Sequence, residues 1–421
     1  MWEKCRELQN EIVTMRRELH RIPELGTELP ETCGYVEKKM KEYGASVRRI
    51  GKSGGLLAEL DTGRPGRITM FRADMDALPV REETGLPFAS EYAGCMHACG
   101  HDAHTAMLLG TAKVLSEELD QFDGIFRFLF QSGEETAEGA LLALKNGALE
   151  PKPDAVFGTH IGTIYGPDIP SGTVIAAPGC VMASMDKFRI RVKGTGSHGS
   201  APEKGIDPIL TGAEIVVGLQ EILSREFAGT VTKVLTVGSF HAGNAFNVIP
   251  EEAVLEGTVR AVDEAVRQQI LRRIREISEN IAAAFRAKAE VELMSGAAPV
   301  MNDPGMAALA AEAAKEIAAQ CGGKVITAVE DPTMVGEDFA YFLEQVPGAF
   351  LFLSSSDPEK HTDYPHHSSH FDVDEDVLWR GAAVFTAIAE RLNRRSDVTC
   401  RGTRPCSYRN PIRGSRPRSG Q

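Results

Sequence analysis

The spacing of hydrophobic residues predicts alternating helices and strands in the first part of the chain. Between residues 2 and 20, apolar positions recur every three or four residues, which is typical of an amphipathic helix. Residues 124–131 are almost wholly apolar, as expected for a strand that is covered on both faces of a sheet. The same reasoning predicts strands at 67–72 and 155–160, and helices at 30–43 and 104–119. This alternation indicates an α/β sheet sandwiched by helices.

The pattern changes near residue 184, where apolar and polar positions begin to alternate strictly. In residues 185–193, Phe188, Ile190 and Val192 lie on one side and charged residues on the other, which predicts a strand with one buried face. The segments that follow predict a helix at 207–223, strands at 233–240 and 253–260, a helix at 263–288 and a strand at 290–293. The order β-α-β-β-α-β is that of a small ferredoxin-like domain.

Two domains and a tail therefore account for the chain. After about residue 297 the pattern returns to a helix at 302–320 and further strands. We expect a larger, discontinuous domain with a mixed-sheet α/β/α architecture at 1–183 and 297–395, interrupted by the ferredoxin-like α+β domain at 184–296. Residues 396–421 contain six arginines and a single acid, and we expect them to be disordered. Such a tail either binds an acidic partner or is a dispensable extension.

Composition narrows the classes of function. The 421 residues carry a net charge of -13, which disfavours nucleic acid and anionic membranes as main partners. No segment approaches the roughly 20 consecutive apolar residues of a membrane span. Residues 1–7 are charged and lack the apolar stretch of a signal peptide, so we expect a soluble protein of the cytoplasm. The eight cysteines show no dense pairing pattern, and we expect free thiols.

The segment from Cys95 to His104 carries the clearest chemical signal. It contains two thiols and three imidazoles within a few residues. Cys99 and His101 are two positions apart, so a turn can direct both side chains at one metal ion. A thiolate beside neutral imidazoles suits a first-row divalent ion such as zinc.

Four other segments carry ligand-type residues, and three of them follow predicted strands. These three end with Asp74 and Asp76, with Glu134 and Glu135, and with His160. The fourth is the histidine-rich segment 364–370 near the C-terminus. Because ligands bind beyond the carboxyl ends of the strands in open α/β sheets, we expect these segments to converge with Cys99 and His101.

The adjacent carboxylates Glu134 and Glu135 suggest a division of labour. Successive residues of an extended segment face opposite ways, so one can bind a metal while the other faces a water molecule. A metal ion lowers the pKa of bound water towards ~7, and a carboxylate that is not a ligand can take its proton. The alternative is that both acids favour the positive end of a helix dipole.

Seven motifs in a fixed order resemble one enzyme family. They are Arg72–Pro79 (RADMDALP), Met96–His104 (MHACGHDAH), Gln131–Ala140 (QSGEETAEGA), Gly194–Pro202 (GTGSHGSAP), Asn247–Pro250 (NVIP), Gly257–Arg260 (GTVR) and Gly336–Phe339 (GEDF). Together they resemble the dinuclear metallo-amidohydrolases of the aminoacylase and glutamate-carboxypeptidase family, and most of all the branch of hippurate hydrolases and indoleacetyl-amino-acid hydrolases. The resemblance covers about residues 10 to 392.

The resemblance implies a role for each candidate at the metal centre. Cys99 would bridge two divalent ions, zinc or manganese. His101 and Glu135 would help to hold one ion, and His160 the other. The last ligand histidine of the family precedes an aromatic-Asp pair by four residues, which gives His367 here. Glu134 would be the general base.

The resemblance also makes the larger domain catalytic and the insert a lid or dimerisation domain. His198 on the insert would stabilise the oxyanion, either in its own chain or across a homodimer. Asn247 and Arg260 would bind the carboxylate of the substrate, which an arginine can do with two parallel hydrogen bonds. Two of these residues have a plainer alternative, since His198 could be an ordinary loop residue and Arg260 a solvated charge.

Supporting roles follow from the same resemblance. Asp74 and Asp76 would support the site rather than bind metal. Asp102 and His104 would orient the ligands.

The sequence departs from the family pattern in two segments. Ser369 replaces the usual proline two residues after the ligand histidine, and His361, His366 and His370 are extra. Residues 161–165 lack the Trp-Pro that is common after the ligand histidine His160. This second segment helps to shape the acyl pocket, so the acyl preference stays open.

The expected function is hydrolysis of the amide bond of N-acyl amino acids. The small-molecule substrate would be an N-acyl amino acid or a short peptide. A metallo-carboxypeptidase or dipeptidase on the same scaffold is the nearest alternative, because it differs only in what fills the acyl pocket. A non-catalytic metal or ligand sensor that has kept the fold is a second alternative. The intact Glu134, the full set of ligand candidates and His198 argue against the sensor.

Overall fold

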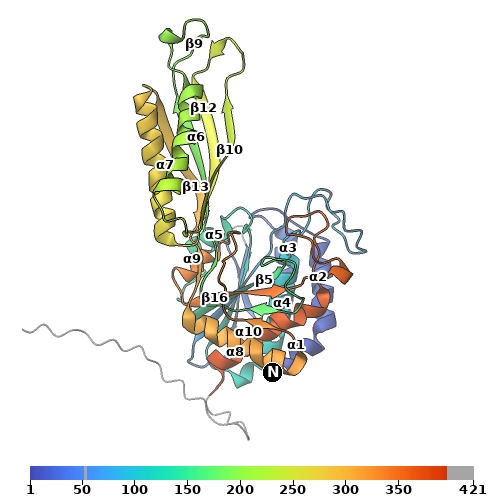
Figure 1. Ribbon diagram of the computed structural model, residues 1–421. Coiled ribbons are helices and arrows are strands. Elements are labelled where there is room, and N and C mark those ends of the chain that lie inside the picture. Colours follow the sequence, from blue (N-terminus) through green and yellow to red (C-terminus); the bar gives the residue numbers. More distant parts are fainter. Residues whose placement is uncertain (52–54, 396–421) are drawn as a thin grey trace, which may run out of the picture.

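Eight strands form one mixed sheet in the larger domain, in the order β1-β2-β4-β3-β5-β16-β6-β15 (Figure 1). The four central strands β4, β3, β5 and β16 are parallel, whereas β2 and β6 pair antiparallel with their neighbours β4 and β16. The strands are β1 (Ser46–Arg49), β2 (Gly55–Asp61), β3 (Ile68–Asp74), β4 (Ile125–Gln131), β5 (Ala155–Gly162), β6 (Val174–Ile175), β15 (Val325–Ile326) and β16 (Gly348–Ser354). The computed structural model describes residues 1–51 and 55–395, so the tail predicted at 396–421 lies outside the described residues.

Helices cover both faces of this sheet. One face packs against α1 (Glu3–Glu7), α2 (Gln9–His20), α3 (Pro30–Glu42), α4 (His101–Glu117), α8 (Pro304–Cys321) and α10 (Leu378–Asn393). The other face packs against α5 (Gly139–Lys145) and α9 (Ala340–Leu343). The three layers confirm the predicted α/β/α architecture.

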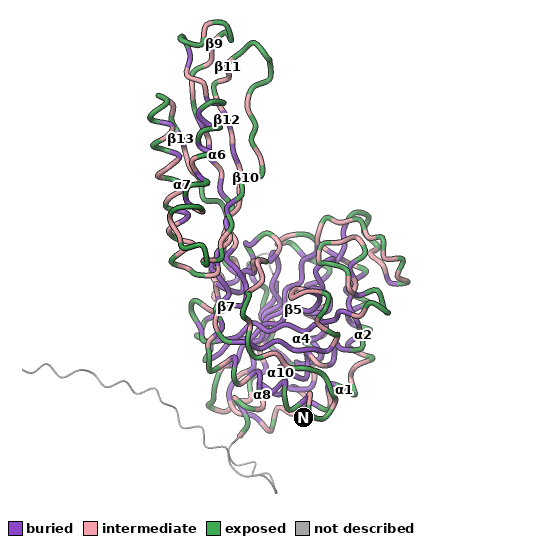
Figure 2. The backbone as a smooth tube through the Cα atoms, viewed as in Figure 1, coloured by how far each residue is buried: buried purple, intermediate pink, exposed green. Residues whose placement is uncertain are grey.

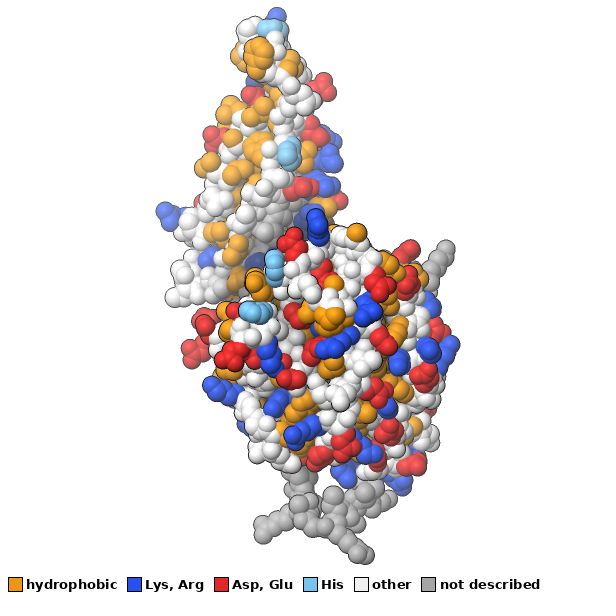
Figure 3. All heavy atoms as spheres, turned by 90° about the vertical axis from the view of Figure 1, so that its right-hand side faces the viewer, with side chains coloured by type: hydrophobic (Ala, Val, Ile, Leu, Met, Phe, Trp, Pro, Cys, Tyr) orange, Lys and Arg blue, Asp and Glu red, His pale blue; other side chains and the backbone are white. Residues whose placement is uncertain are grey.

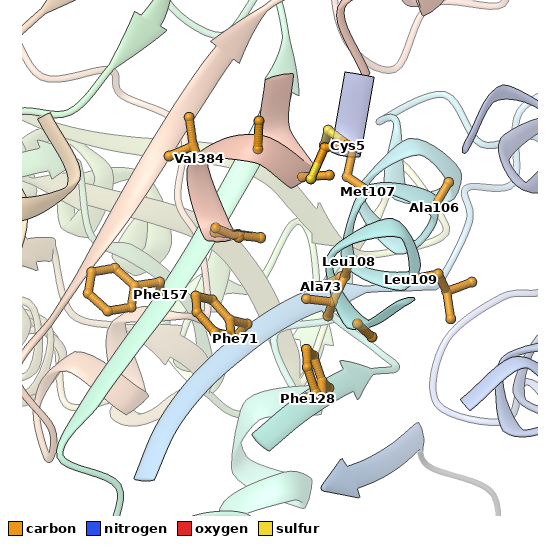
Figure 4. Packing of buried hydrophobic residues seen from close by; sticks show 14 of the residues in the cluster. Cys5, Phe71, Ala73, Ala106, Met107, Leu108, Leu109, Phe128, Phe157 and Val384 are labelled. Carbon is orange, nitrogen blue, oxygen red and sulfur yellow. The ribbon is translucent and has the colours of Figure 1, made fainter. Parts of the chain in front are cut away.

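The buried core explains why the central strands are apolar throughout. Phe71, Phe128 and Phe157 come from β3, β4 and β5 and stack side by side under α4 and α10 (Figure 4). The residues next to them along the strands, such as Met70 and Leu129, are equally buried on the opposite face. Successive strand residues point to opposite faces, so a strand covered on both sides needs apolar residues at every position.

The insert is a four-stranded antiparallel sheet with two helices on one face. The strand order is β10-β12-β8-β13, and α6 and α7 pack on the face that buries Phe188, Ile190 and Val192. The elements are β8 (Met185–Lys193), β9 (Ser197–His198), α6 (Pro208–Arg225), β10 (Lys233–Ala242), β11 (Val248–Ile249), β12 (Glu252–Ala261), α7 (Glu264–Ala284) and β13 (Lys288–Ala297). The predicted order of strands and helices in this domain is confirmed. Figure 2 shows that the insert has a thin buried layer and projects away from the larger domain.

Two short paired strands connect the larger domain to the insert. Strand β7 (Gly179–Met182) leads into the insert, and β14 (Val300–Asn302) leads back out of it. The two strands pair antiparallel, with Val300 opposite Met182 and Asn302 opposite Gly179. The insert is therefore attached to the larger domain by one paired ribbon.

Some elements differ from the sequence-based expectation. Helix α4 begins at His101 rather than at residue 104, because Gly100 takes a left-handed φ of 87° and starts the helix directly after itself. Strands β1 and β2 and helices α5 and α10 were not predicted from the pattern. Within the described part of the chain, the structure contains no helix with the length and apolar character needed to cross a membrane.

Candidate metal centre

The candidate site lies at the carboxyl ends of three adjacent parallel strands. Strand β3 ends at Asp74, opposite Gln131 at the end of β4, and β5 lies on the other side of β3. Glu134 and Glu135 follow β4 directly, and His160 lies near the end of β5. The convergence that the sequence predicted is therefore present at this edge of the sheet.

The turn before α4 brings Cys99 and His101 to the candidate site. Because Gly100 is left-handed, the chain reverses direction between Cys99 and His101 and brings both side chains to the strand ends. A side chain at residue 100 would not fit easily, since a Cβ there would lie 3.1 Å from Cγ2 of Ile161. The left-handed φ therefore favours glycine at this position, and Ile161 leaves little room for a side chain.

Two sets of candidate ligand atoms share the Cys99 sulfur. Cys99, His101 and His160 form one set, and Cys99, Glu135 and His367 form the other, with the atoms of each set within 4.8 Å of one another. A third set consists of His101, Glu134 and Glu135. The first set pairs His101 with His160 and the second pairs Glu135 with His367, whereas the resemblance paired His101 with Glu135, a pairing that the third set allows. The assignment of ligands to ions therefore stays a prediction.

Hydrogen bonds to the backbone orient two of the ligand candidates, His101 and His160. His101 donates from Nδ1 to the carbonyl oxygen of Asp76 at 2.8 Å, and His160 donates from Nδ1 to that of Ile161 at 2.8 Å. Each ring therefore presents the lone pair of its Nε2 atom. Among the described residues, Nε2 of His101 and Oε1 of Glu135 are buried without a hydrogen-bond partner. A buried nitrogen and a buried oxygen that lack a hydrogen-bond partner and lie beside a thiol are suited to binding a cation.

The aspartates orient their neighbours. The carboxylate of Asp76 accepts the backbone N–H groups of Glu134 and Glu135, each at 3.0 Å, and so fixes the turn that carries both acids. His104 accepts the N–H of Ile161 at Nε2 and donates from Nδ1 to Asp74 at 2.5 Å. These bonds agree with the supporting roles expected for Asp74, Asp76 and His104.

Negative charge dominates the centre. Burial raises the pKa of Glu134 well above its usual range, and the acids Glu337 and Glu135 raise it further. For His101, burial opposes protonation, but the carboxylates of Asp74 and Asp76 outweigh it and raise the pKa to about 10. A surplus of buried carboxylates stabilises bound cations in the same way that it stabilises a proton.

His367 reaches the site from an exposed loop. Its backbone N–H donates to the carbonyl oxygen of Ala98 at 2.8 Å, and its φ of 67° is unusual for a residue other than glycine. Its Nε2 lies 3.5 Å from Oε2 of Glu135. The loop thus holds His367 beside the Cys99 segment.

The structure divides the three candidates on the insert between two places. His198 on β9 and Asn247 lie together, because β9 pairs with β11 and Gly199 donates its N–H to the carbonyl oxygen of Asn247 at 2.7 Å. Figure 1 shows β9 at the far end of the insert from the strands β5 and β16. Arg260 instead lies at the near end, where it lines a cleft of about 560 Å³ together with Glu135.

A group of buried acids had no role assigned from the sequence. Arg72 donates to Asp74, Glu337 and Asp338 at 2.7–2.9 Å, and carboxylate oxygens of Glu337 and Asp338 lie within 4.8 Å of one on Glu134. The motif Gly336–Phe339 was a signal for this group, but spacing alone did not indicate which residues its acids would meet.

His366 was also given no role. It lies next to Cys99, with its Nδ1 3.6 Å from the sulfur.

Comparison with known proteins identifies one family. The model of peptidase family M20/M25/M40 matches residues 70–391. This range contains the ligand candidates, Glu134 and the whole insert.

Curated relatives match almost the whole chain. N-acetyl-L-cysteine deacetylase of Bacillus subtilis (strain 168) is 40% identical over 385 residues, 91% of this chain and 89% of that protein. Thermostable carboxypeptidase 1 of Saccharolobus solfataricus is 36% identical and covers 93% of this chain and 97% of its own length. Hippurate hydrolase of Campylobacter jejuni is 36% identical, over 91% of this chain and 97% of that protein. The branch that the motifs resembled is thereby confirmed.

A solved structure matches most of the chain. The crystal structure of the Bacillus subtilis YXEP protein, a dinuclear metal binding peptidase from the M20 family, matches with a TM-score of 0.76. It is 35% identical and covers 91% of this chain and 97% of its own.

Proposed function

The chain belongs to peptidase family M20/M25/M40, and on that premise we propose that it hydrolyses N-acyl amino acids to a carboxylate and a free amino acid. One observation carries the proposal. Two sets of ligand atoms share Cys99, Glu134 lies beside them, and Arg260 lines the same cleft as Glu135. This combination provides for metal binding, proton transfer and recognition of a carboxylate in one place.

Two divalent ions, zinc or manganese, would be held by Cys99, His101, Glu135, His160 and His367. The thiolate, the three imidazoles and the carboxylate suit either ion, and the buried unpartnered Nε2 of His101 and Oε1 of Glu135 support occupancy. When bound, such ions lower the pKa of water and polarise the scissile carbonyl.

Glu134 would act as the general base. It directly precedes Glu135 on the turn fixed by Asp76, and one of its carboxylate oxygens lies within 4.8 Å of the candidate ligand atoms of His101 and Glu135. After taking a proton from water, Glu134 would pass it to the nitrogen of the leaving amino acid.

Arg260 would bind the free carboxylate of the substrate. Its side chain donates to Oγ1 of Thr258 and to the carbonyl oxygen of Val259, and the nearby acid Asp186 pairs with Arg267 instead. A half-buried guanidinium with spare donors in a cleft suits a ligand carboxylate.

A second copy of the chain would supply His198 and Asn247, because both lie at the end of the insert that is far from the metal centre of their own chain. Ser200 donates its backbone N–H to Nδ1 of His198 at 3.2 Å, so Nε2 carries the proton that an oxyanion would accept as a hydrogen bond.

The surface of the insert supports such a homodimer. Hydrophobic side chains gather on the face that Figure 3 presents. Several large ones are well exposed on this domain, namely Ile209, Leu210, Val217, Phe246 and Val248. Apolar side chains gathered on an exposed face are typical of an interface.

A metallo-carboxypeptidase or dipeptidase is the second candidate. The Saccharolobus solfataricus relative is named a carboxypeptidase, and cleavage of a peptide next to a free carboxylate would use the same base and the same arginine. The two candidates differ only in the group that fills the acyl side of the cleft.

The test is the release of free amine from a panel of substrates. Purified protein loaded with zinc or with manganese is offered N-acetyl, N-benzoyl and indoleacetyl amino acids beside dipeptides and longer peptides. We expect faster turnover of one acyl class than of any peptide. Preferential cleavage of peptides would favour the carboxypeptidase, and no cleavage with both metals bound would contradict the proposal.

A further inference from the structure

The two segments that depart from the family pattern contact each other beside Cys99. The backbone N–H of Thr163 donates to Nε2 of His366 at 3.0 Å, and Oγ1 of Thr163 donates to the carbonyl oxygen of Tyr364 at 3.2 Å. A proline, which the family pattern commonly has in this segment, lacks an N–H and could not make the first bond at residue 163. The extra histidine and the altered segment therefore belong to one arrangement.

The bond from Thr163 decides which nitrogen of His366 carries the proton. A backbone N–H can only donate, so Nε2 of His366 must be the accepting, unprotonated nitrogen. The proton of the ring then lies on Nδ1. This atom is 3.6 Å from Sγ of Cys99, within the range of a hydrogen bond to sulfur.

Packing holds the ring in this position. It contacts the ring of Phe371, with centroids 4.7 Å apart, and meets the ring of His160 edge-on at 4.9 Å. Gly162 makes the space, because a Cβ there would lie 2.3 Å from Cε1 of His366. The ring is thus fixed by a backbone donor, two aromatic neighbours and a glycine.

We propose that His366 is a positioning residue that donates a hydrogen bond from Nδ1 to the Cys99 thiolate and orients the sulfur towards the metal ions. The inference rests on the proposed metal centre and concerns this chain's own residues toward it. His366 itself would not be a ligand, since its two nitrogens are committed to Thr163 and to the sulfur. Partners that orient metal ligands typically contribute about 10–100-fold to metal affinity.

Cobalt(II) provides a probe of the sulfur itself. A cobalt–thiolate bond gives a charge-transfer absorption band whose energy depends on the electron density at sulfur. A hydrogen bond stabilises the sulfur lone pair, so its loss moves the band to longer wavelength. A change that only loosened the fold would weaken the band without moving it.

The experiment compares three variants with the wild-type protein after loading with cobalt. We expect His366→Leu to move the band to longer wavelength and to raise the dissociation constant of cobalt by about 10–100-fold. His366→Asn keeps an N–H near the position of Nδ1 and should restore most of both properties. His370→Leu is the matched control, because His370 lies on the same loop, exposed and stacked on Tyr364, and it should behave as the wild type.

The outcomes separate this inference from the proposed function. An unmoved band in folded His366→Leu protein, or an Asn variant as shifted as the Leu variant, would overturn the role of His366 alone. Absence of any thiolate band in the wild-type protein would overturn the Cys99 metal centre and this inference with it.

Discussion

At the scale of single residues, hydrogen bonds to the backbone hold several side chains of the candidate centre in place. Nδ1 of His101 and Nδ1 of His160 each donate a hydrogen bond to a backbone carbonyl oxygen. Both carboxylate oxygens of Asp76 accept hydrogen bonds from backbone N–H groups. Such bonds fix orientation before any ligand binds, so little rearrangement is needed on binding. The chemistry of the centre then depends on a few atoms that individual substitutions can remove.

Replacing Glu134 with glutamine should separate proton transfer from metal binding. The amide is isosteric but cannot accept a proton, so we expect kcat to fall by about 10²–10⁴-fold. Two metal ions per chain should remain, because Glu135 and the other ligand candidates are intact. Elemental analysis beside the amine-release assay checks both statements. Full activity of this variant would contradict the role of Glu134.

Replacing Arg260 with methionine should remove recognition of the substrate carboxylate. The loss of charge-assisted hydrogen bonds, worth about 1.5–3 kcal/mol, should lower kcat/KM by about tenfold to a hundredfold. The discriminating measurement uses each N-acyl amino acid beside its uncharged amide. The wild-type protein should prefer the carboxylate and the variant should lose that preference. A variant that slows both substrates equally would point to a structural role instead.

At the scale of elements, the first turn of α4 is tied to α2 by a buried guanidinium. Arg16 on α2 is fully buried and donates to Asp102 and Asp372 at 2.8 Å and to Glu375 at 3.2 Å. Asp102 follows the ligand candidate His101 directly. The bonds of Arg16 therefore connect the helix layer to the start of the metal centre.

Substitution of Arg16 should destabilise the protein far more than substitution of its neighbour. Arg16→Met leaves buried carboxylates without their cation, and we expect a loss of about 3–5 kcal/mol in the free energy of unfolding. Arg17 also pairs with Glu375 but is half exposed, so Arg17→Met should cost less than about 1 kcal/mol. Denaturant unfolding of the two variants checks the difference. Equal losses would show that burial does not control the strength of these pairs.

Elements with a strong local pattern were predictable from the sequence, and elements fixed by distant partners were not. Strand β8 was predicted with its observed bounds because Phe188, Ile190 and Val192 alternate with charges. Helix α4 was predicted to begin three residues late, because its start depends on the left-handed Gly100 and on the strand ends that it meets. Cys99 and His101 were named as ligand candidates because a thiol and imidazoles close together in the sequence are typical of a metal site, whereas His367 was named only through the resemblance to a family. Thr163 and His366 are 203 residues apart in the sequence, so only the fold reveals their contact.

At the scale of the whole molecule, the site is spread over parts of the chain that do not meet within one copy. Arg260 lies near the metal centre, whereas His198 lies at the opposite end of the insert. The proposed oxyanion donor His198 therefore lies far from Glu134 of its own chain. The proposed homodimer accounts for this separation.

Mixing two inactive variants tests the exchange of His198 between copies. A Glu134→Gln chain has no base but a complete insert, and a His198→Ala chain has a base but no oxyanion donor. In a mixed dimer, one site combines the intact Glu134 of one chain with the intact His198 of the other. Co-expressed, separately tagged chains should recover about a quarter of the wild-type activity, since half of the dimers are mixed and each has one complete site. Activity no higher than that of either variant alone would show that His198 does not act across copies.

Because β7 and β14 pair with each other, the insert is a segment that evolution can exchange as a unit. Because the two strands pair, the chain leaves and re-enters the larger domain at points about 4.8 Å apart, one strand spacing. A segment with such close ends can be shortened, lengthened or replaced without breaking the host fold. The metal centre can thus be inherited unchanged while the insert diverges, so new substrates and new assemblies can arise from one ancestral hydrolytic core.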